Sequence, residues 1–261
     1  MRTPAEPLVP VERDPRKLRR TALILVLIMI ASGVVILMSY QKWGRQQAEK
    51  EMQHARPGIV GRIDNKAEFG VVRQDASGAK ISDLFGKVWV VCGVSVKDPD
   101  SWKATREVLL RLNQRYADND DFRVVCFTID PNQEGHEVLD AASKELGVGL
   151  PKWWFAGAGE EFVHKFLKNQ LKLGIMPHKK DGKWVYDSSI TLIDRDRHIR
   201  RAVVPQQRGG PPYVAVFDFA QAADWDAKGV KTGNEKTNAE QLEFLLVKTI
   251  DELLAQPVAA P

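Results

Sequence analysis

Hydrophobic and polar residues alternate in blocks along this chain, and the blocks predict strands that alternate with helices. An apolar, β-branched run over residues 88–96 leads into the polar loop Lys97-Asp98-Pro99-Asp100, and an amphipathic segment over residues 101–116 follows. Apolar residues spaced three and four apart line one face of a helix, whereas a short continuous apolar run suits a buried strand. The stretch therefore predicts a strand, a loop and a helix, with Asp100 or Ser101 as the N-cap.

The same pattern recurs through residue 255. It predicts further strands at residues 68–73, 79–81, 122–129, 153–156, 184–185, 189–193 and 199–204. It predicts further helices at residues 134–146, 159–173 and 238–255. Strands that alternate with helices indicate a mostly parallel sheet with helices on both faces, and a late hairpin adds antiparallel edge strands. The expected fold class is an α/β, thioredoxin-like sandwich.

One apolar segment near the N-terminus stands apart from this pattern. Residues 21–40 contain no charged side chain and are about as long as one helix needs to be to cross a bilayer. Five basic residues lie between positions 13 and 20, and only Lys42, Arg45 and Lys50 follow the segment closely. This bias places the N-terminus in the cytoplasm and the rest of the chain outside it. We expect a signal anchor, because the run is longer than that of a cleaved signal peptide and no A-x-A site follows it.

The expected organisation has one domain with appendages. It comprises a basic cytoplasmic tail (1–20), a transmembrane signal anchor (21–40), a polar juxtamembrane spacer (41–64), a thioredoxin-like domain (65–255) and a flexible tail (256–261). The 261 residues, 44% of them hydrophobic, suffice for one full core. The net charge of +4 is small and dispersed, so nucleic acid is not an expected partner.

The junction between the strand at 88–96 and the next helix is where thioredoxin-like proteins carry reactive cysteines, because a helix N-terminus stabilises a thiolate. This junction contains no cysteine. Cys92 and Cys126 are the only cysteines, and each lies in the middle of an apolar run. There a cysteine is expected to be a small, inert hydrophobe, and a reactive or paired role is the alternative.

A series of short sequences resembles the Sco/SenC family of membrane-anchored, thioredoxin-fold proteins. They are Asp83-Leu84-Phe85-Gly86-Lys87-Val88-Trp89, Pro99-Asp100, Asp130-Pro131, Trp153-Trp154, and Ser188-Ser189 leading to Leu192-Ile193-Asp194. The resemblance covers residues 66–204 and the last helix. The resemblance implies copper binding and thiol redox chemistry during assembly of the terminal respiratory oxidase. It also implies a C-P-D-x-C loop and a distant histidine as copper ligands.

This chain departs from the family at every ligand. Alignment on Pro99-Asp100 puts Asp98 and Trp102 where the two cysteines belong. Alignment on Leu192-Ile193-Asp194 puts Tyr186, or Asp187 with a one-residue gap, where the histidine belongs. Cu(I) prefers thiolate, thioether or imidazole ligands, and carboxylate, indole and phenol do not replace them. We therefore expect no metal or cofactor at these positions, and copper is implied by the resemblance alone.

Met176 and His178 form a weak alternative copper site. They place a thioether and an imidazole two residues apart, and both are ligands that copper accepts. Lys179 and Lys180 follow directly, and their positive charges oppose a cation. A surface loop is the favoured interpretation of this segment.

Residues 205–237 form an insertion that the minimal fold does not need, and long insertions are often functional. The insertion carries Tyr213, Phe217, Phe219 and Trp225, and such side chains anchor protein interfaces when they are exposed. These four aromatic residues are the interaction candidates. The alternative is that they pack on the domain's own surface.

The sequence thus predicts a membrane-anchored, extracytoplasmic Sco-like protein with a degenerate copper and thiol site. We expect a non-enzymatic assembly or binding role in respiratory (cytochrome c) oxidase biogenesis. The expected partners are the lipid bilayer, through residues 21–40, and a respiratory-complex subunit or assembly factor. One alternative is a copper-binding or thiol-disulfide redox protein that uses Cys92, Cys126 or Met176 and His178. The other is a structural interaction module unrelated to copper.

Overall fold

The computed structural model describes residues 15–64, 69–206, 210–230 and 236–257. Parts of the expected tails, of the first hairpin strand and of the insertion therefore lie outside the described residues. The chain divides into two compact units, Met1–Ala48 and Glu49–Pro261.

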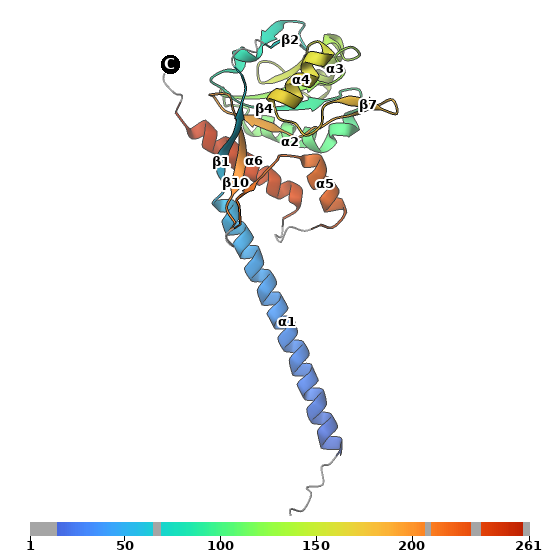
Figure 1. The fold of residues 1–261 in the computed structure, drawn as a ribbon, viewed down its shortest axis with the longest axis vertical. Coiled ribbons are helices and arrows are strands. Elements are labelled where there is room, and N and C mark those ends of the chain that lie inside the picture. The colour runs from blue at the N-terminus through green and yellow to red at the C-terminus, as the bar shows by residue number, and fades with distance from the viewer. Residues whose placement is uncertain (1–14, 65–68, 207–209, 231–235, 258–261) are drawn as a thin grey trace, which may run out of the picture. The chain divides into compact units, whose positions relative to one another are not determined.

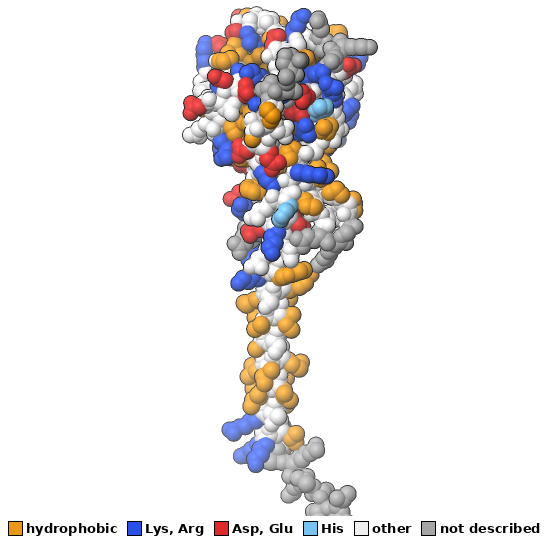
Figure 2. All heavy atoms as spheres, turned by 90° about the vertical axis from the view of Figure 1, so that its left-hand side faces the viewer, with side chains coloured by type: hydrophobic (Ala, Val, Ile, Leu, Met, Phe, Trp, Pro, Cys, Tyr) orange, Lys and Arg blue, Asp and Glu red, His pale blue; other side chains and the backbone are white. Residues whose placement is uncertain are grey.

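The first unit consists of one helix among its described residues. Helix α1 (Pro15–Gln53) is continuous over 39 residues, includes the whole apolar run and ends within the second unit. Figure 2 shows hydrophobic side chains all along the middle of this helix, and Lys and Arg side chains gathered near its start. The helix is long and apolar enough to cross a membrane, as the sequence predicted.

The described residues of the second unit form a mixed sheet of nine strands, which Figure 1 shows with helices around it. The strands are β1 (Arg56–Arg62), β2 (Gly70–Arg73), β3 (Gly78–Lys80), β4 (Val88–Val94), β5 (Phe122–Thr128), β6 (Trp153–Gly157), β9 (Thr191–Ile193), β10 (His198–Val204) and β11 (Tyr213–Val214). Their order is β1-β10-β9-β4-β5-β6-β2-β3, and β11 also pairs with β10. Strands β7 (His178–Lys180) and β8 (Lys183–Val185) form a separate hairpin.

The expectation of a mostly parallel sheet is corrected by the pairing. Among the described strands, only β4 with β5 and β5 with β6 are parallel pairs. The other pairs of described strands in the sheet are antiparallel. Parallel neighbours need a crossover connection, and the helices α2 (Lys103–Arg115) and α3 (His136–Glu145) provide the two that occur here. The expected α/β sandwich with helices around a central sheet is confirmed.

Helices cover both faces of the sheet, and each face has its own core. Helices α2 and α3 share one core with α5 (Phe219–Ala227) and α6 (Asn238–Ala255). Helix α4 (Glu160–Lys165) and the π-helical turn Phe166–Gln170 close the other core. In β4, Val90 and Cys92 face the first core, whereas Trp89 and Val91 face the second. Successive strand residues point to opposite faces, so burial on both sides explains the unbroken apolar run.

Helix α6 has the bounds that the sequence predicted, and its N-terminus shows why. The Thr237 hydroxyl accepts a hydrogen bond from the Glu240 amide at 3.2 Å, and the Glu240 carboxylate accepts one from the Thr237 amide at 2.8 Å. This reciprocal capping box satisfies two amides at the start of the helix. A local sequence signal therefore fixes where the helix begins.

Residues 41–64, the expected juxtamembrane spacer, contain the end of a helix and one strand. Helix α1 continues to Gln53, and β1 follows and pairs with β10. The Lys248 ammonium donates to the carbonyl oxygens of Gln53 at 2.5 Å and Ala55 at 2.7 Å, which ties the connection to α6. The sheet thus begins at Arg56, ahead of the expected domain start at residue 65. The edge strand β1 is half exposed and lacks the apolar alternation that marks a strand in sequence.

Candidate functional site

The loop after β4 occupies the place of the expected reactive site. A 3₁₀ turn (Pro99–Trp102) with proline in its first position leads from the loop into α2. The Ser101 hydroxyl donates to the backbone oxygen of Asp98 at 2.6 Å and closes the turn. The Asp98 side chain is exposed to solvent. The loop therefore presents a carboxylate where the family resemblance implies a thiol.

Trp102 points into the core rather than into the loop. It is 2% exposed, and its indole N–H donates to the Ser95 carbonyl oxygen at 2.9 Å. Its ring meets Phe155 edge to face, with 6.3 Å between the ring centroids. An indole nitrogen carries a proton and no free lone pair, so it donates and does not ligate. Trp102 anchors the loop to the core at the position where the family resemblance implies a second cysteine.

Tyr186 reaches the same loop from the connection between β8 and β9. Its hydroxyl oxygen lies 2.6 Å from the Ser101 hydroxyl and accepts from the Ser95 amide at 3.3 Å. Burial is the main cause that raises the pKa of Tyr186 to about 12. The phenol therefore stays protonated at neutral pH. Through its contacts with Ser101 and Ser95, Tyr186 lies beside the loop that carries Asp98 and Trp102 and helps to close that loop.

Asp187, the other residue aligned with the family histidine, is engaged elsewhere. One carboxylate oxygen accepts from the amide and the hydroxyl of Ser189 at 2.8 and 2.5 Å. The other accepts from the Gly174 amide at 2.5 Å. Asp187 thus joins the entry to β9 to the segment that precedes β7, and its contacts are structural.

A buried carboxylate beneath the loop was not found by the sequence analysis. Glu134 is 1% exposed and accepts from the Ser95 hydroxyl at 2.8 Å, the Lys97 amide at 2.9 Å and the Thr128 hydroxyl at 2.5 Å. These contacts join the loop after β4 to the end of β5. In sequence Glu134 lies at the start of a predicted helix, where an acidic residue is ordinary, so no local signal marks it.

The residues around the loop do not fit Cu(I). The donors available are a solvent-exposed carboxylate, a protonated phenol and an indole N–H that is already hydrogen-bonded. Cu(I) prefers soft sulfur ligands or imidazole. The chemistry that these side chains support here is closure of the loop by hydrogen bonds.

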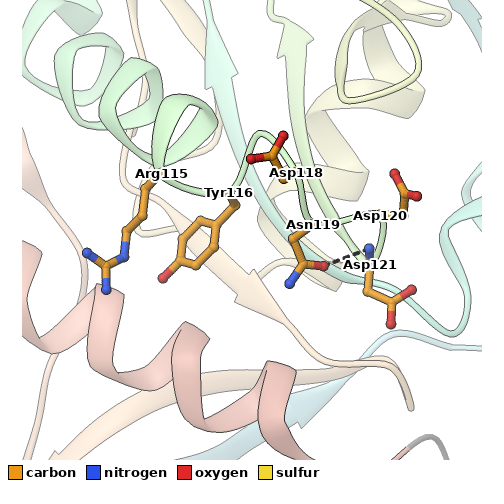
Figure 3. Close-up of a pocket in the computed structure, with 6 residues that line it drawn as sticks. All are labelled: Arg115, Tyr116, Asp118, Asn119, Asp120 and Asp121. Atoms are coloured by element: carbon orange, nitrogen blue, oxygen red, sulfur yellow. Dashed lines mark hydrogen bonds between the residues drawn. The ribbon is translucent and has the colours of Figure 1, made fainter.

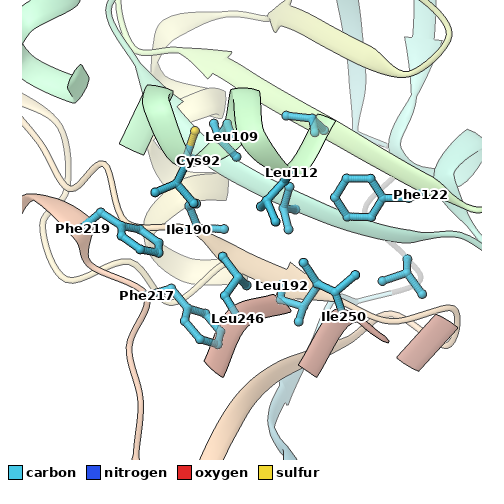
Figure 4. Packing of buried hydrophobic residues seen from close by; sticks show 14 of the residues in the cluster. Cys92, Leu109, Leu112, Phe122, Ile190, Leu192, Phe217, Phe219, Leu246 and Ile250 are labelled. Atoms are coloured by element: carbon cyan, nitrogen blue, oxygen red, sulfur yellow. The ribbon is translucent and has the colours of Figure 1, made fainter. Parts of the chain in front are cut away.

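Cys92 and Cys126 lie opposite each other on β4 and β5, in the core that Figure 4 shows. Their sulfur atoms are 3.9 Å apart, and both side chains are fully buried. Burial is the main cause that raises the pKa of the Cys126 thiol. A buried thiol with a raised pKa forms little thiolate, and the thiolate is the reactive species. The geometry favours the packing role that the sequence predicted.

Met176 and His178 lie on the surface, but His178 begins strand β7 instead of belonging to a loop. The His178 Nδ1 atom is 3.0 Å from the Met176 backbone oxygen. The Lys179 ammonium sits 4.7 Å from the centre of the Trp184 ring and 3.6 Å from the Asp130 carboxylate. Trp184 and Asp130 thus hold the positive charge of Lys179 in the hairpin that contains His178.

The structure divides the four interaction candidates of the insertion. Phe217 and Phe219 are each 1% exposed and pack in the core with Leu246 and Ile190 (Figure 4). They are therefore core residues, and the expectation that they contact a partner is corrected. An isolated β-bridge between Phe217 and Ile190 holds this segment against the domain. Tyr213 is 50% exposed and Trp225 is 37% exposed, so these two remain candidates.

A polar hollow lies beside the end of α2, and Figure 3 shows its lining. Its residues already bond to the rest of the domain: the Tyr116 hydroxyl donates to Asp251 at 2.7 Å, and Lys87 and Arg195 donate to Asp121 at 2.8 and 3.0 Å. The hydrogen bond from Lys87 is the largest cause that lowers the pKa of Asp121. The residues that line the hollow thus make structural contacts that join the loop before β5 to α6 and to the rest of the domain.

Asp194, Asp196 and His198 come close enough together to suggest a metal site in the turn before β10. Arg200 donates to Asp194 at 2.6 Å, and the amides of Asp196 and His198 also donate to it. A carboxylate with this set of donors is a turn-stabilising group rather than a metal ligand.

No protein-family model and no curated protein matches this chain. Among solved structures, a SCO1/SenC family lipoprotein from Bacillus anthracis is similar, with a TM-score of 0.53 and 18% identity over 75% of this chain and 96% of that one. A putative electron transfer protein from Aquifex aeolicus has a TM-score of 0.49 and 15% identity over 57% of this chain and 85% of that one. Copper-bound ScoI from Arabidopsis thaliana has a TM-score of 0.43 and 16% identity over 62% of this chain and 95% of that one. The first similarity shows that this chain has a Sco-like thioredoxin fold.

Proposed function

We propose that this chain is a divergent member of the Sco/SenC family that acts as a non-enzymatic assembly or binding factor in respiratory (cytochrome c) oxidase biogenesis. The fold similarity and the order of the family-like sequences support the relationship. The apolar helix α1 supports a membrane anchor, and the basic residues before it support a cytoplasmic N-terminus. The domain then lies outside the cytoplasm.

The single observation that carries the non-enzymatic part is the closure of the loop after β4. Trp102 is buried with its N–H bonded to Ser95, and the Tyr186 hydroxyl bonds to Ser101 and Ser95. A loop closed in this way offers neither a thiolate nor a soft ligand, so the family's copper and thiol chemistry has no place there. What remains for function is the surface of the domain, including Trp225 of the insertion.

Copper titration of the full chain in detergent tests the loss of the site. Competition against a Cu(I) chelator should show no stoichiometric, high-affinity binding, since the side chains around the loop offer only oxygen ligands and an indole N–H. Tight binding that disappears on Asp98→Ala or Tyr186→Phe would overturn the degenerate-site proposal. Tight binding lost only in Cys92→Ala, Cys126→Ala, or the pair Met176→Leu and His178→Ala would favour the alternative site.

Complementation tests the assembly role. A strain that lacks this chain should assemble less cytochrome c oxidase, measured by the haem absorbance of its membranes. The wild-type chain and the Cys92→Ala variant should both restore the enzyme, because the proposed role needs surfaces and no thiol. Unchanged oxidase in the deletion strain would contradict the role. Restoration by wild type but not by a folded Cys92→Ala variant would instead favour a redox function.

A further inference from the structure

The segment that contains the β7–β8 hairpin concentrates positive charge on the domain. Residues 168–183 include five lysines, one histidine and a single acidic residue, Asp181. The excess of lysine over acidic residues in this segment is as large as the net charge of +4 of the whole chain. Figure 1 shows the hairpin projecting from the side of the domain. The near balance of charge over the whole chain therefore hides a local excess here.

The register of the hairpin separates its side chains into two faces. Lys179 pairs with Trp184, and Lys180 pairs with Lys183. Residues paired across strands share a face, and successive residues along a strand alternate between faces. Lys179 and Trp184 thus lie on one face, whereas His178, Lys180 and Lys183 lie on the other and are exposed. We call these last three residues the basic face of the hairpin.

The face with Lys179 and Trp184 holds the hairpin against the domain. The Trp184 indole N–H donates to the Asp130 carboxylate at 2.8 Å, and its ring meets His164 edge to face with 5.4 Å between the ring centroids. The Lys179 ammonium lies 3.6 Å from the same carboxylate. The charge of Lys179 is therefore offset within the domain.

The basic face has no such compensation. Among the residues that the structure describes, no carboxylate pairs with Lys180 or Lys183. Asp181 and Gly182 between them have φ angles of 51° and 77°, which suit a two-residue turn that keeps the two lysines directly opposite each other. Their Cβ atoms are then about 5 Å apart, and like charges in such a pair destabilise a hairpin. The fold thus holds two positive charges together without a described contact that offsets their repulsion.

We propose that the basic face of the β7–β8 hairpin docks an acidic segment of a partner protein. Adjacent carboxylates on the partner would relieve the repulsion between Lys180 and Lys183, and a hairpin that is already fixed to the domain loses little freedom on binding. Ile175 and Met176, each 42% exposed, precede the hairpin and add apolar area beside the charges. The inference rests on the binding role of the proposed function and names the chemistry of the partner.

An acidic protein suits this face better than an anionic bilayer does. Segments that lie in a membrane interface combine lysines with exposed Trp, Phe or Leu side chains. Trp184 is the one aromatic residue of residues 178–185, and it is turned toward His164 and Asp130. The basic face itself offers charge without an aromatic anchor.

Lysine acetylation of the full chain in phosphatidylcholine nanodiscs tests the proposal, with polyglutamate as the probe. Mass spectrometry measures acetylation at each lysine with and without polyglutamate, at low salt because salt screens exposed charges. Lys144 and Lys228 are internal controls: their side chains are 76% and 65% exposed, and each pairs with an aspartate four residues earlier. Polyglutamate should slow acetylation of Lys180 and Lys183 several-fold and leave the controls nearly unchanged. Equal protection of all four lysines, or of none, would overturn the inference.

Two double variants that remove the same charge test whether the hairpin is a site. Lys180→Gln with Lys183→Gln should weaken the binding of labelled polyglutamate several-fold. Lys144→Gln with Lys228→Gln is the matched control and should bind almost as the wild type does. Equal weakening in both would mean that net charge alone attracts the probe, which contradicts a docking face. Nanodiscs of phosphatidylglycerol that protect Lys180 and Lys183 without polyglutamate would assign the face to a bilayer and also overturn the inference.

Complementation separates this inference from the proposed function. In the deletion strain, Lys180→Glu with Lys183→Glu should fail to restore the oxidase, whereas Lys144→Glu with Lys228→Glu should restore it. Restoration by both variants would contradict the docking face alone, because rescue by the wild type would still support the assembly role. Unchanged oxidase in the deletion strain would contradict the assembly role, and the polyglutamate measurements would still decide whether the basic face binds carboxylates.

Discussion

At the scale of single residues, the side chains around the loop after β4 close it by hydrogen bonds. Trp102 supplies apolar area and one N–H, and Tyr186 supplies a hydroxyl that bonds within the protein. Glu134 completes the arrangement from below, since its buried carboxylate accepts hydrogen bonds from two hydroxyls and one amide. Each of these groups makes its contacts inside the folded domain.

The raised pKa of Tyr186 predicts a loss of stability at alkaline pH. Its pKa is about 12 in the folded protein, against an ordinary value of 10. Above pH 10 the unfolded state loses this proton first, so it binds fewer protons than the folded state and stability falls as the pH rises toward 12. Between about pH 9 and pH 11 the wild type should lose about 1 kcal/mol more than Tyr186→Phe. Urea unfolding of the full chain in detergent, followed by tryptophan fluorescence, measures this difference. Parallel pH profiles for the two proteins would contradict the assignment.

At the scale of elements, the pairing of β1 with β10 depends on a close approach at one glycine. A Cβ atom at Gly58 would overlap the Val203 side chain, whereas one at Gly61 would meet only Ile199 at an ordinary distance of 3.5 Å. The two glycines lie on the same strand, three residues apart. Gly58 is therefore needed for packing, and Gly61 is not.

Replacement of Gly58 by alanine should destabilise the domain by about 1–3 kcal/mol, because the new methyl group forces Val203 or the edge strand to move. Gly61→Ala is the matched control and should cost clearly less. The double variant Gly58→Ala with Val203→Ala should recover part of the loss, since the overlapping methyl groups are removed. Urea unfolding of the wild type, of the Gly58→Ala and Val203→Ala single variants and of the double variant gives the coupling energy, and Gly61→Ala is measured beside them. Equal losses at Gly58 and Gly61, or no recovery in the double variant, would show that the overlap does not govern this edge.

At the scale of the whole molecule, the proposed function requires the domain to lie outside the cytoplasm. The basic residues before the apolar run and the length of α1 together predict a tethered domain outside the cytoplasm. Protease added to intact spheroplasts should digest the domain, and alkaline carbonate should leave the untreated chain in the membrane pellet. An N-terminal epitope should stay protected until the cells are lysed. A domain that resists protease in intact spheroplasts would contradict this orientation.

Local signals in the sequence determined the features that depend on neighbouring residues. The uncharged run predicted a helix able to cross a membrane, and α6 begins where the sequence predicted, at a capping box formed by Thr237 and Glu240. The doubly buried strands β4 and β5 are apolar at almost every position, so they were recognisable without a structure. Burial on both faces leaves an unbroken apolar run, and a capping box needs only four consecutive residues.

Only the tertiary structure decided the features that depend on distant residues. Phe217 and Tyr213 are both aromatic residues of the insertion, but the bridge to Ile190 turns Phe217 into the core while Tyr213 stays exposed. Strand β1 exists because β10 offers it hydrogen bonds, and its own sequence carries no strand pattern. Tyr186 and Glu134 meet the loop after β4 from other parts of the chain. Sequence patterns record burial and local caps, whereas the partner of a hydrogen bond is fixed only when the whole chain has folded.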